Sequence, residues 1–221
     1  MIARGEHELD MADLLHFNPE DPRYPTALLH GYAPDARPPL VARGNLELIE
    51  GPLLALFCSI KCPGRLILQT YDLARVLREA GVTVVSGFHS PMERECLALL
   101  LRGAQPVVIC PARSIDGMRL PLEWRDPLTS ERILLLSAFD QTADRATAAR
   151  AAARNKLVAA LATQILVLHA ARGSRTDEFC RGLLNRGRSV LTLDAPENAP
   201  LISSGARPVT AGGVATHVGS R

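Results

Sequence analysis

The chain has 221 residues, of which 47% are hydrophobic and only 4% are aromatic. This length and apolar content suit one large α/β domain or two small ones, and they exclude a mostly unstructured chain. The 25 basic and 23 acidic residues leave a net charge of +2. The total charge therefore neither demands nor excludes a nucleic-acid partner, and the clustering of charge matters more.

The cysteines and histidines of the chain do not suggest a metal or a disulfide framework. The five cysteines include no C-x-x-C pair and most stand in apolar runs, which is typical of reduced core thiols. The histidines lack the spacing of zinc ligands, so no metal is expected. The sequence contains neither a signal peptide nor an apolar run of about 18 residues, which predicts a cytoplasmic protein with no membrane span.

The chain divides into three parts by its pattern. Residues 1–50 are polar and rich in proline, and we expect them to form an arm packed on the following domain. Within this arm, residues 11–17 are a candidate short helix and residues 40–42 a candidate short strand. Residues 51–210 form the main domain, and residues 211–221 lack apolar periodicity and are predicted to be disordered.

The main domain alternates short apolar runs with amphipathic segments. The expected strands are residues 53–58, 82–86, 107–110, 133–136, 165–169 and 189–193, with an edge strand at 208–209. The expected helices are residues 65–80, 91–102, 144–162 and 176–186, and residues 111–130 form the longest irregular connection. This alternation predicts an α/β fold with a doubly wound, mostly parallel, Rossmann-like sheet and helices on both faces.

Ligands of such sheets bind beyond the carboxyl ends of the strands, where the strand order reverses. The cations expected near this edge are Lys61, Arg94, Arg113, Arg172 and Arg175. If the topology holds, they gather on one rim although they are scattered in sequence. Ordinary surface charge is the alternative explanation, and the sequence leaves it open.

One turn near this edge has two interpretations. It consists of Arg172, Gly173, Ser174, Arg175 and Thr176, between an apolar strand and a helix. Its backbone N–H groups and the helix dipole favour an anion. Capping of the helix by Ser174, with Asp177 three residues on, explains the same residues without a ligand.

The sequence offers no clear catalytic group. The nucleotide-binding motifs G-x-G-x-x-G and G-x-x-x-x-G-K-[ST] are absent, so no cofactor is expected. Ser59 and Ser86 end strands, but without G-x-S-x-G or a partner histidine they suit phosphate hydrogen bonds or capping better than nucleophilic attack. His89 stands in a loop expected to face a ligand, and a plain surface role is its alternative. Glu93 and Glu95 lie two residues apart, which makes them a poor acid/base pair.

A set of short motifs extends from about residue 24 to residue 209. They are Tyr24-Pro25, Pro38-Pro39-Leu40-Val41-Ala42-Arg43-Gly44 followed by Leu46, Ser86-Gly87, Arg154-Asn155, Gly173-Ser174 with Thr176, and Ala199-Pro200-Leu201-Ile202 with Gly205-Ala206. Together they resemble the DNA-processing protein A family, also called Smf. The chain resembles a short, divergent member with the Rossmann-like domain only.

The sequence departs from the family pattern in two loops. The V-G-S-R turn after the first central strand is Phe57-Cys58-Ser59-Ile60 here, without its glycine and arginine, although Lys61 follows. The G-I-D segment of the second loop is Pro91-Met92-Glu93.

The resemblance implies binding of single-stranded DNA in recombination or natural transformation, without catalysis, and it allows a homodimer. It also implies that Arg154 and Asn155 approach the same pocket as the Arg172 turn. The candidate residues for binding nucleic acid or phosphate are Ser59, Lys61, Ser86, Gly87, His89, Arg94, Arg113, Arg154, Asn155, Arg172, Gly173, Ser174, Arg175 and Thr176.

The alternative is a protein that binds or processes a free nucleotide, like the phosphoribohydrolases of the wider superfamily. Their P-G-G-x-G-T-x-x-E motif would fall at residues 172–178 here. The first glycines are missing, and Glu178 follows Thr176 by two residues instead of three. This spacing turns a catalytic carboxylate away from the pocket, so the sequence favours binding over an enzymatic role.

Overall fold

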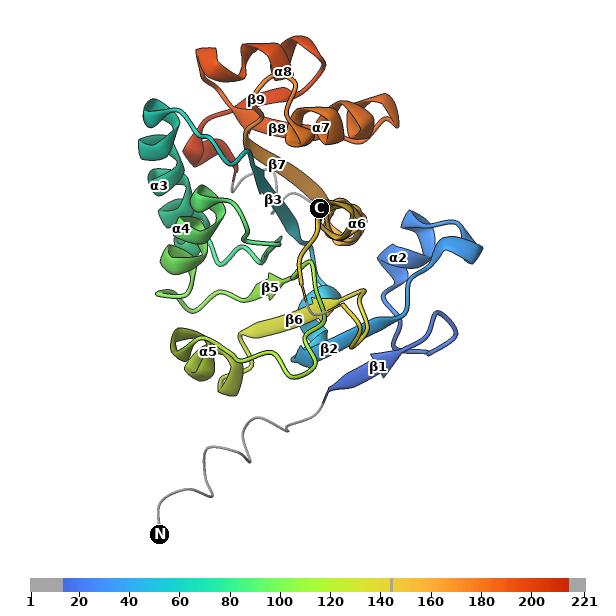
Figure 1. Cartoon of the computed structure of the whole chain (residues 1–221). Helices are drawn as coiled ribbons and strands as arrows, with labels where there is room; N and C mark the ends of the chain where they lie inside the picture. The colour runs from blue at the N-terminus through green and yellow to red at the C-terminus, as the bar shows by residue number, and fades with distance from the viewer. Residues whose placement is uncertain (1–13, 144, 215–221) are drawn as a thin grey trace.

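A computed structural model describes residues 14–143 and 145–214 of the chain. They form one nine-stranded sheet with the order β1-β2-β6-β5-β4-β3-β7-β8-β9 (Figure 1). The strands are β1 (Leu15–Phe17), β2 (Leu40–Gly44), β3 (Leu54–Cys58), β4 (Val84–Ser86), β5 (Val107–Ile109), β6 (Ile133–Ser137), β7 (Gln164–His169), β8 (Val190–Leu193) and β9 (Arg207–Val209).

The seven strands β3 to β9 run parallel to one another. The chain winds outward from β3 through β4, β5 and β6, returns to the other side of β3, and winds outward again through β7, β8 and β9. The central strands are buried on both faces, as their continuous apolar runs predict. The predicted doubly wound α/β fold is confirmed, and the strand order reverses between β3 and β7.

The N-terminal strands extend the sheet in the opposite direction. β2 pairs with β6 in antiparallel fashion, and β1 pairs with β2. The prediction of a helix over residues 11–17 is wrong at Leu15–Phe17, where strand pairing places Phe17 in the core and overrides the weak local pattern. The rest of that prediction concerns residues 11–13, which lie outside the described residues, and Leu14, which precedes the strand.

Helices cover both faces of the sheet. The α-helices are α2 (Thr26–Gly31), α3 (Gly64–Glu79), α4 (Pro91–Leu100), α5 (Arg125–Thr129), α6 (Ala148–Leu161), α7 (Arg175–Asn185) and α8 (Ala199–Ser203), and the short 3₁₀ helices are Pro34–Ala36, Leu46–Ile49, Leu122–Trp124 and Pro196–Asn198. Figure 1 shows α3 and α4 on one face of the sheet and α2 and α6 on the other. Two apolar clusters result: one under α3 and α4, the other under α2, α6, α7 and α8.

Two segments differ from the expected boundaries. α6 begins at Ala148 instead of residue 144, because the Thr147 side chain accepts a hydrogen bond from the Arg150 N–H and caps the helix there. In the segment expected to be disordered, residues 211–214 form a helical turn and Val214 is fully buried. Residues 215–221 lie outside the described residues.

The described residues contain no helix that combines the length and the apolar character needed to cross a bilayer.

We expect residues 1–50 to act as an arm that stabilises the domain. A chain starting at Gly51 loses β1 and β2, which uncovers the edge of β6, so its melting temperature should fall and it should aggregate more readily.

Gly44→Ala should weaken the pairing of β2 with β6 by about 1–3 kcal/mol, because Gly44 has φ +110° and a Cβ there would overlap the Ile133 carbonyl.

Thermal unfolding followed by circular dichroism checks both changes. Gly51→Ala is the matched control, since a Cβ added at Gly51 would meet no heavy atom within 4 Å and Gly51 has no left-handed φ. A truncated chain that melts like the full chain would show that the arm is only a linker.

Candidate nucleic-acid interface

The loops after β3 and β7 meet where the strand order reverses. The Ser59 hydroxyl lies 3.1 Å from the Ser174 hydroxyl and accepts a hydrogen bond of 3.0 Å from the Ala171 N–H. The Ser59 N–H donates to the His169 carbonyl over 2.8 Å. Ser59 and Ser174 therefore come together, and Ser59, which is buried, ties the two loops to each other.

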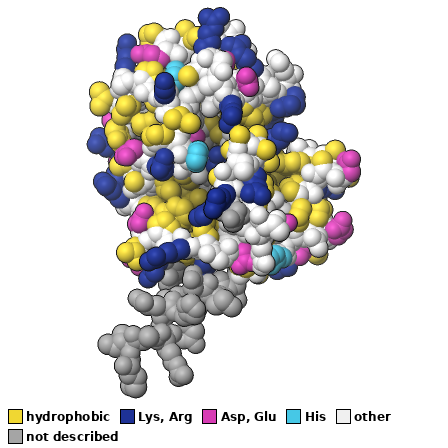
Figure 2. Space-filling model, in the orientation of Figure 1, with side chains coloured by type: hydrophobic (Ala, Val, Ile, Leu, Met, Phe, Trp, Pro, Cys, Tyr) yellow, Lys and Arg dark blue, Asp and Glu magenta, His cyan; other side chains and the backbone are white. Residues whose placement is uncertain are grey.

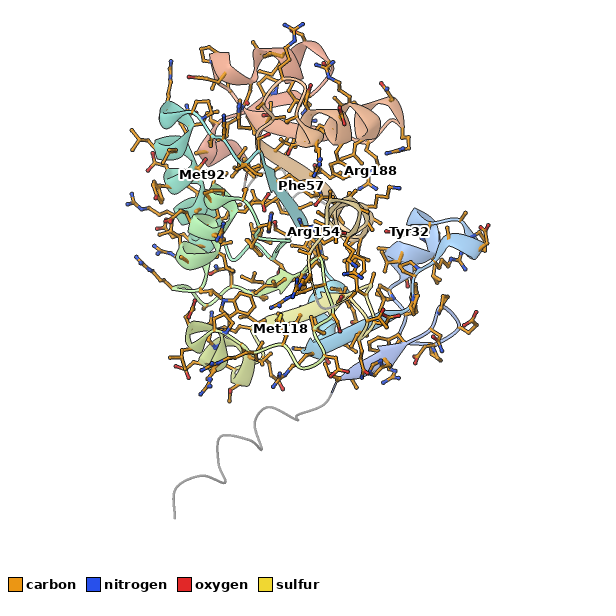
Figure 3. The ribbon with its side chains drawn as sticks, in the orientation of Figure 1. Tyr32, Phe57, Met92, Met118, Arg154 and Arg188 are labelled. Atoms are coloured by element: carbon orange, nitrogen blue, oxygen red, sulfur yellow. The ribbon has the colours of Figure 1, made fainter. Side chains whose placement is uncertain are left out.

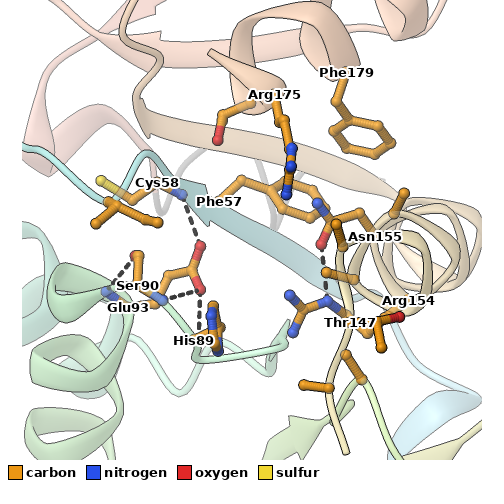
Figure 4. A pocket seen from close by; sticks show the side chains of 17 residues that line it. Phe57, Cys58, His89, Ser90, Glu93, Thr147, Arg154, Asn155, Arg175 and Phe179 are labelled. Carbon is orange, nitrogen blue, oxygen red and sulfur yellow. Dashed lines mark hydrogen bonds between the residues drawn. The ribbon is translucent and has the colours of Figure 1, made fainter.

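A cavity of about 320 Å³ opens at this point (Figure 4). The predicted residues that line it are His89, Arg154, Asn155, Arg175 and Thr176. Phe57 and Phe179 form part of its wall, with their rings edge to face at a centroid distance of 5.2 Å. The cavity thus combines cationic, amide and aromatic groups at the place where doubly wound sheets bind ligands.

Arg154 reaches this cavity from α6 and is 5% exposed. Its Nε donates to the Asn155 Oδ1 over 2.8 Å, and its Nη1 donates to the Cys110 carbonyl over 3.3 Å. Burial lowers the pKa of the Arg154 guanidinium, and the nearby Glu93 charge raises it. A Cβ at Gly87 would overlap this guanidinium, so the glycine leaves room for Arg154.

Arg175 is the first residue of α7 and enters the cavity from the other side. Figure 4 shows its exposed side chain extending toward Phe57 and Asn155, while Arg154 lies across the cavity. Thr176 follows it in the first turn of the helix, whose N-terminal end carries a partial positive charge. Two guanidiniums from α6 and α7 therefore face one space.

Glu93 is a site residue that the sequence interpretation missed. Its buried carboxylate accepts hydrogen bonds from the N–H groups of Cys58 at 2.8 Å, His89 at 2.7 Å and Ser90 at 3.1 Å. Its spacing from Glu95 in the sequence gives no hint of this role. The available signal is the S-x-x-E spacing of Ser90 and Glu93, which forms a capping box at the start of α4.

Ser86 does not serve as a hydroxyl donor to a ligand. It is fully buried, its Oγ donates to the Leu56 carbonyl over 2.8 Å, and it accepts from the Phe88 N–H over 3.1 Å. Because its single hydroxyl proton is already used, Ser86 connects β4 to β3 and shapes the following loop. The prediction that placed it in the binding set is wrong in this respect.

Capping accounts for Gly173 and Ser174 in the Arg172 turn, whereas Arg175 and Thr176 of the same turn line the cavity. The Gly173 N–H donates to Asp177 Oδ2 over 3.0 Å, and the Ser174 N–H donates to the Ala171 carbonyl over 2.9 Å. The Asp177 carboxylate thus occupies the position expected for an anion, and Gly173 and Ser174 offer no free amide to a phosphate. Arg172 is exposed and does not line the cavity.

The remaining predicted cations lie outside the cavity wall. Lys61, Arg94 and Arg113 are exposed, and none of them lines the cavity. Figure 2 shows Lys and Arg side chains distributed around apolar surface on this face of the molecule. Their contact with a ligand stays a prediction.

Three further observations concern the chemistry of the site. No group of three His, Cys, Asp or Glu side chains within the described ranges is arranged to hold a metal ion. Glu178 is exposed and does not line the cavity, as its spacing from Thr176 suggests. All five cysteines are free thiols, and burial raises the pKa of Cys110 and Cys180 to about 12.

The fold and the cavity define a doubly wound α/β protein with a cationic pocket at the reversal of its strand order. DNA processing protein A from Streptococcus pneumoniae has a similar structure, with a TM-score of 0.78 and 20% identity over 100% of this chain and 80% of that one. DNA processing protein A from Helicobacter pylori gives a TM-score of 0.74 and 18% identity over 94% and 96% of the two chains, and its structure concerns a single-stranded DNA binding mode.

A molybdenum cofactor carrier protein from Chlamydomonas reinhardtii is a more distant neighbour, with a TM-score of 0.52 and 12% identity over 76% of this chain and 96% of that one. At these identities the likenesses concern the fold alone. No curated protein sequence matches the chain. The sequence model of DNA recombination-mediator protein A matches residues 16–220, and the chain belongs to this family.

Gly87→Ala tests the placement of Arg154. Gly87 has no left-handed φ, so the added methyl group acts only through its overlap with the guanidinium, and we expect a loss of about 1–3 kcal/mol in the free energy of unfolding. Denaturation by urea measures the change. The control is Gly64→Ala at the start of α3, where a Cβ meets no atom within 4 Å. Equal stability of the two variants would contradict the expected loss and show that the Arg154 guanidinium moves aside at little cost.

Proposed function

We propose that this protein binds single-stranded DNA at the cavity between α6 and α7, without catalysing a reaction on it. The observation that carries the proposal is the pair Arg154 and Arg175, which face each other across a space with aromatic walls. Membership of the DNA recombination-mediator protein A family and the single-stranded DNA binding mode of the Helicobacter pylori relative support the same function.

The two arginines suit a phosphate backbone. Within the described part of the chain, neither Arg154 nor Arg175 has a carboxylate within 4 Å, so both retain donors for an incoming anion. Charge-assisted hydrogen bonds gain strength where water is excluded, as around the buried Arg154. Phe57 and Phe179 add apolar surface for a base, whose π-face stacks regardless of sequence.

A nucleotide-processing reaction has less support. It would need a carboxylate in the cavity that is free to exchange a proton or attack a sugar. Glu93 is the acidic residue of the cavity lining, and three backbone donors hold it. We therefore assign Glu93 a structural role and propose binding without chemistry.

Two expectations from the sequence remain as proposals. We propose that the protein is cytoplasmic. We also propose that it forms a homodimer, and light scattering of the purified protein measures the mass of the particle. A bound free nucleotide would appear as excess absorbance at 260 nm after purification. Its presence would favour the nucleotide-binding alternative over DNA.

Arg175→Ala should weaken binding of a fluorescent oligothymidylate by about 1.5–3 kcal/mol, the range for a hydrogen bond to a charged group. Because the Arg175 side chain is exposed, the melting temperature should stay unchanged. Fluorescence anisotropy measures the affinity. Arg75→Ala is the matched control, since Arg75 is an exposed residue of α3 that lines neither cavity.

The wild-type affinity should depend on salt. Each phosphate contact with single-stranded DNA contributes a slope of about −0.7 to log affinity against log salt, so roughly four to six engaged cations give about −3 to −4. A lack of binding at low salt, or binding that ignores salt, would contradict the proposed function.

A further inference from the structure

A second, larger groove of about 700 Å³ lies beside the first cavity. Its walls come from the end of α2 and the following segment, from the loop after β6, from the outer side of α6, and from α7 with the turn that follows it. Residues that characterise these walls are Tyr32, Phe139, Lys156, Phe179, Arg186 and Arg188.

The two spaces adjoin each other along α6 and α7. Phe179 lines both of them. Helix α6 also borders both spaces, because Ala152 lines the first cavity and the next residue, Ala153, lines the second groove. A flexible polymer seated near Arg175 therefore needs only to cross Phe179 to enter the groove.

The walls of the groove are fixed by close packing. A Cβ at Gly31 would lie 2.8 Å from the Ala160 Cβ, so α2 and α6 are in tight contact. On the other side, the Arg188 Nη2 donates to the carbonyls of Ala159 and Ala162 at 2.9 Å each. Figure 3 shows Tyr32 and Arg188 near α6, in the same region as Arg154. The groove is thus a preformed feature that requires no rearrangement to accept a ligand.

The charge of the groove is suited to a polyanion. Lys156 and Arg186 are exposed, and neither has a carboxylate within 4 Å among the described residues. The groove lining contains no Asp or Glu in the described part of the chain. Burial also raises the pKa of Tyr32 to about 12, so its phenol stays neutral and can donate a hydrogen bond.

We propose that this groove is a second subsite for single-stranded DNA, which binds the nucleotides next to those in the first cavity. The inference rests on the proposed function of the first cavity. Cations that contact the backbone, interleaved with aromatic rings that stack on bases, form the usual path for a single strand. Lys156 and Arg186 contact phosphates, and Tyr32 and Phe139 contact bases. The shared wall at Phe179 places the groove next to the first cavity, which favours the same polymer over an acidic peptide.

The test compares oligothymidylates of roughly 4 to 16 nucleotides, the range of typical single-strand sites. The double variant Lys156→Ala/Arg186→Ala should bind the shortest strand as the wild type does. It should bind the longest about tenfold or more weakly, with a salt slope reduced by about 1.4 for two lost contacts. Arg175→Ala should weaken binding at every length. The matched control, Arg75→Ala/Arg102→Ala, removes two exposed charges outside both spaces.

Photo-crosslinking with 5-iododeoxyuridine in the strand locates the contact directly. Long strands should give adducts at Tyr32 or Phe139, and short strands at Phe179. An unchanged affinity of the double variant for long strands, with Arg175→Ala still impaired, would overturn the second subsite and leave the proposed function standing. The second subsite would also be overturned if the wild type bound a polyglutamate peptide, the double variant did not, and both proteins bound DNA equally well. Failure of the wild type to bind any strand at low salt would remove both proposals.

Discussion

The carboxylate of Glu93 is the interaction on which the arrangement of the site depends. Its two oxygens accept three backbone N–H groups, one from the end of β3 and two from the loop between β4 and α4. Charge-assisted bonds of this kind contribute about 1.5–3 kcal/mol each, and their loss would leave three backbone donors without this partner, those of Cys58 and Ser90 in buried positions. A single side chain thereby fixes two loops that follow neighbouring strands. Its negative charge also raises the pKa of Arg154, which opposes the lowering by burial.

The position of Arg154 follows from those fixed loops. Ser86 holds the end of β4 through its bonds to Leu56 and Phe88, and Gly87 comes next. Because Gly87 lacks a Cβ, the Arg154 guanidinium fits against its backbone and reaches the Cys110 carbonyl. A cation from α6 is thus held at the carboxyl edge of the sheet by contacts with β4 and β5. The cavity is therefore organised before any ligand arrives, which reduces the entropy lost on binding.

Much of the fold was predictable because short apolar runs and helical periodicity are local signals. The doubly wound order follows from their alternation, whereas the β1 strand at Leu15–Phe17 depends on pairing with β2 and has little local signal. The site was less predictable because it depends on contacts between segments that are distant in sequence. Sequence spacing identified Ser174 and Asp177 as a cap, but did not show that Asp177 also takes the Gly173 N–H. The burial of Arg154 against Gly87 is a contact between distant segments, which spacing alone does not reveal.

The loop after β3 brings an apolar side chain to the cavity where the resembling family has an arginine. Ile60 stands where the V-G-S-R turn of the resembling family ends in arginine, and Ile60 lines the same cavity as Arg175. Ile60 brings no charge to this space, and the guanidinium of Arg175 enters it from α7, on the opposite side of the strand-order reversal. An anion responds to the position of a guanidinium and not to the element that carries it. The constraint on such a site is thus the presence of charge at the cavity wall, which Arg154 from α6 and Arg175 from α7 supply here.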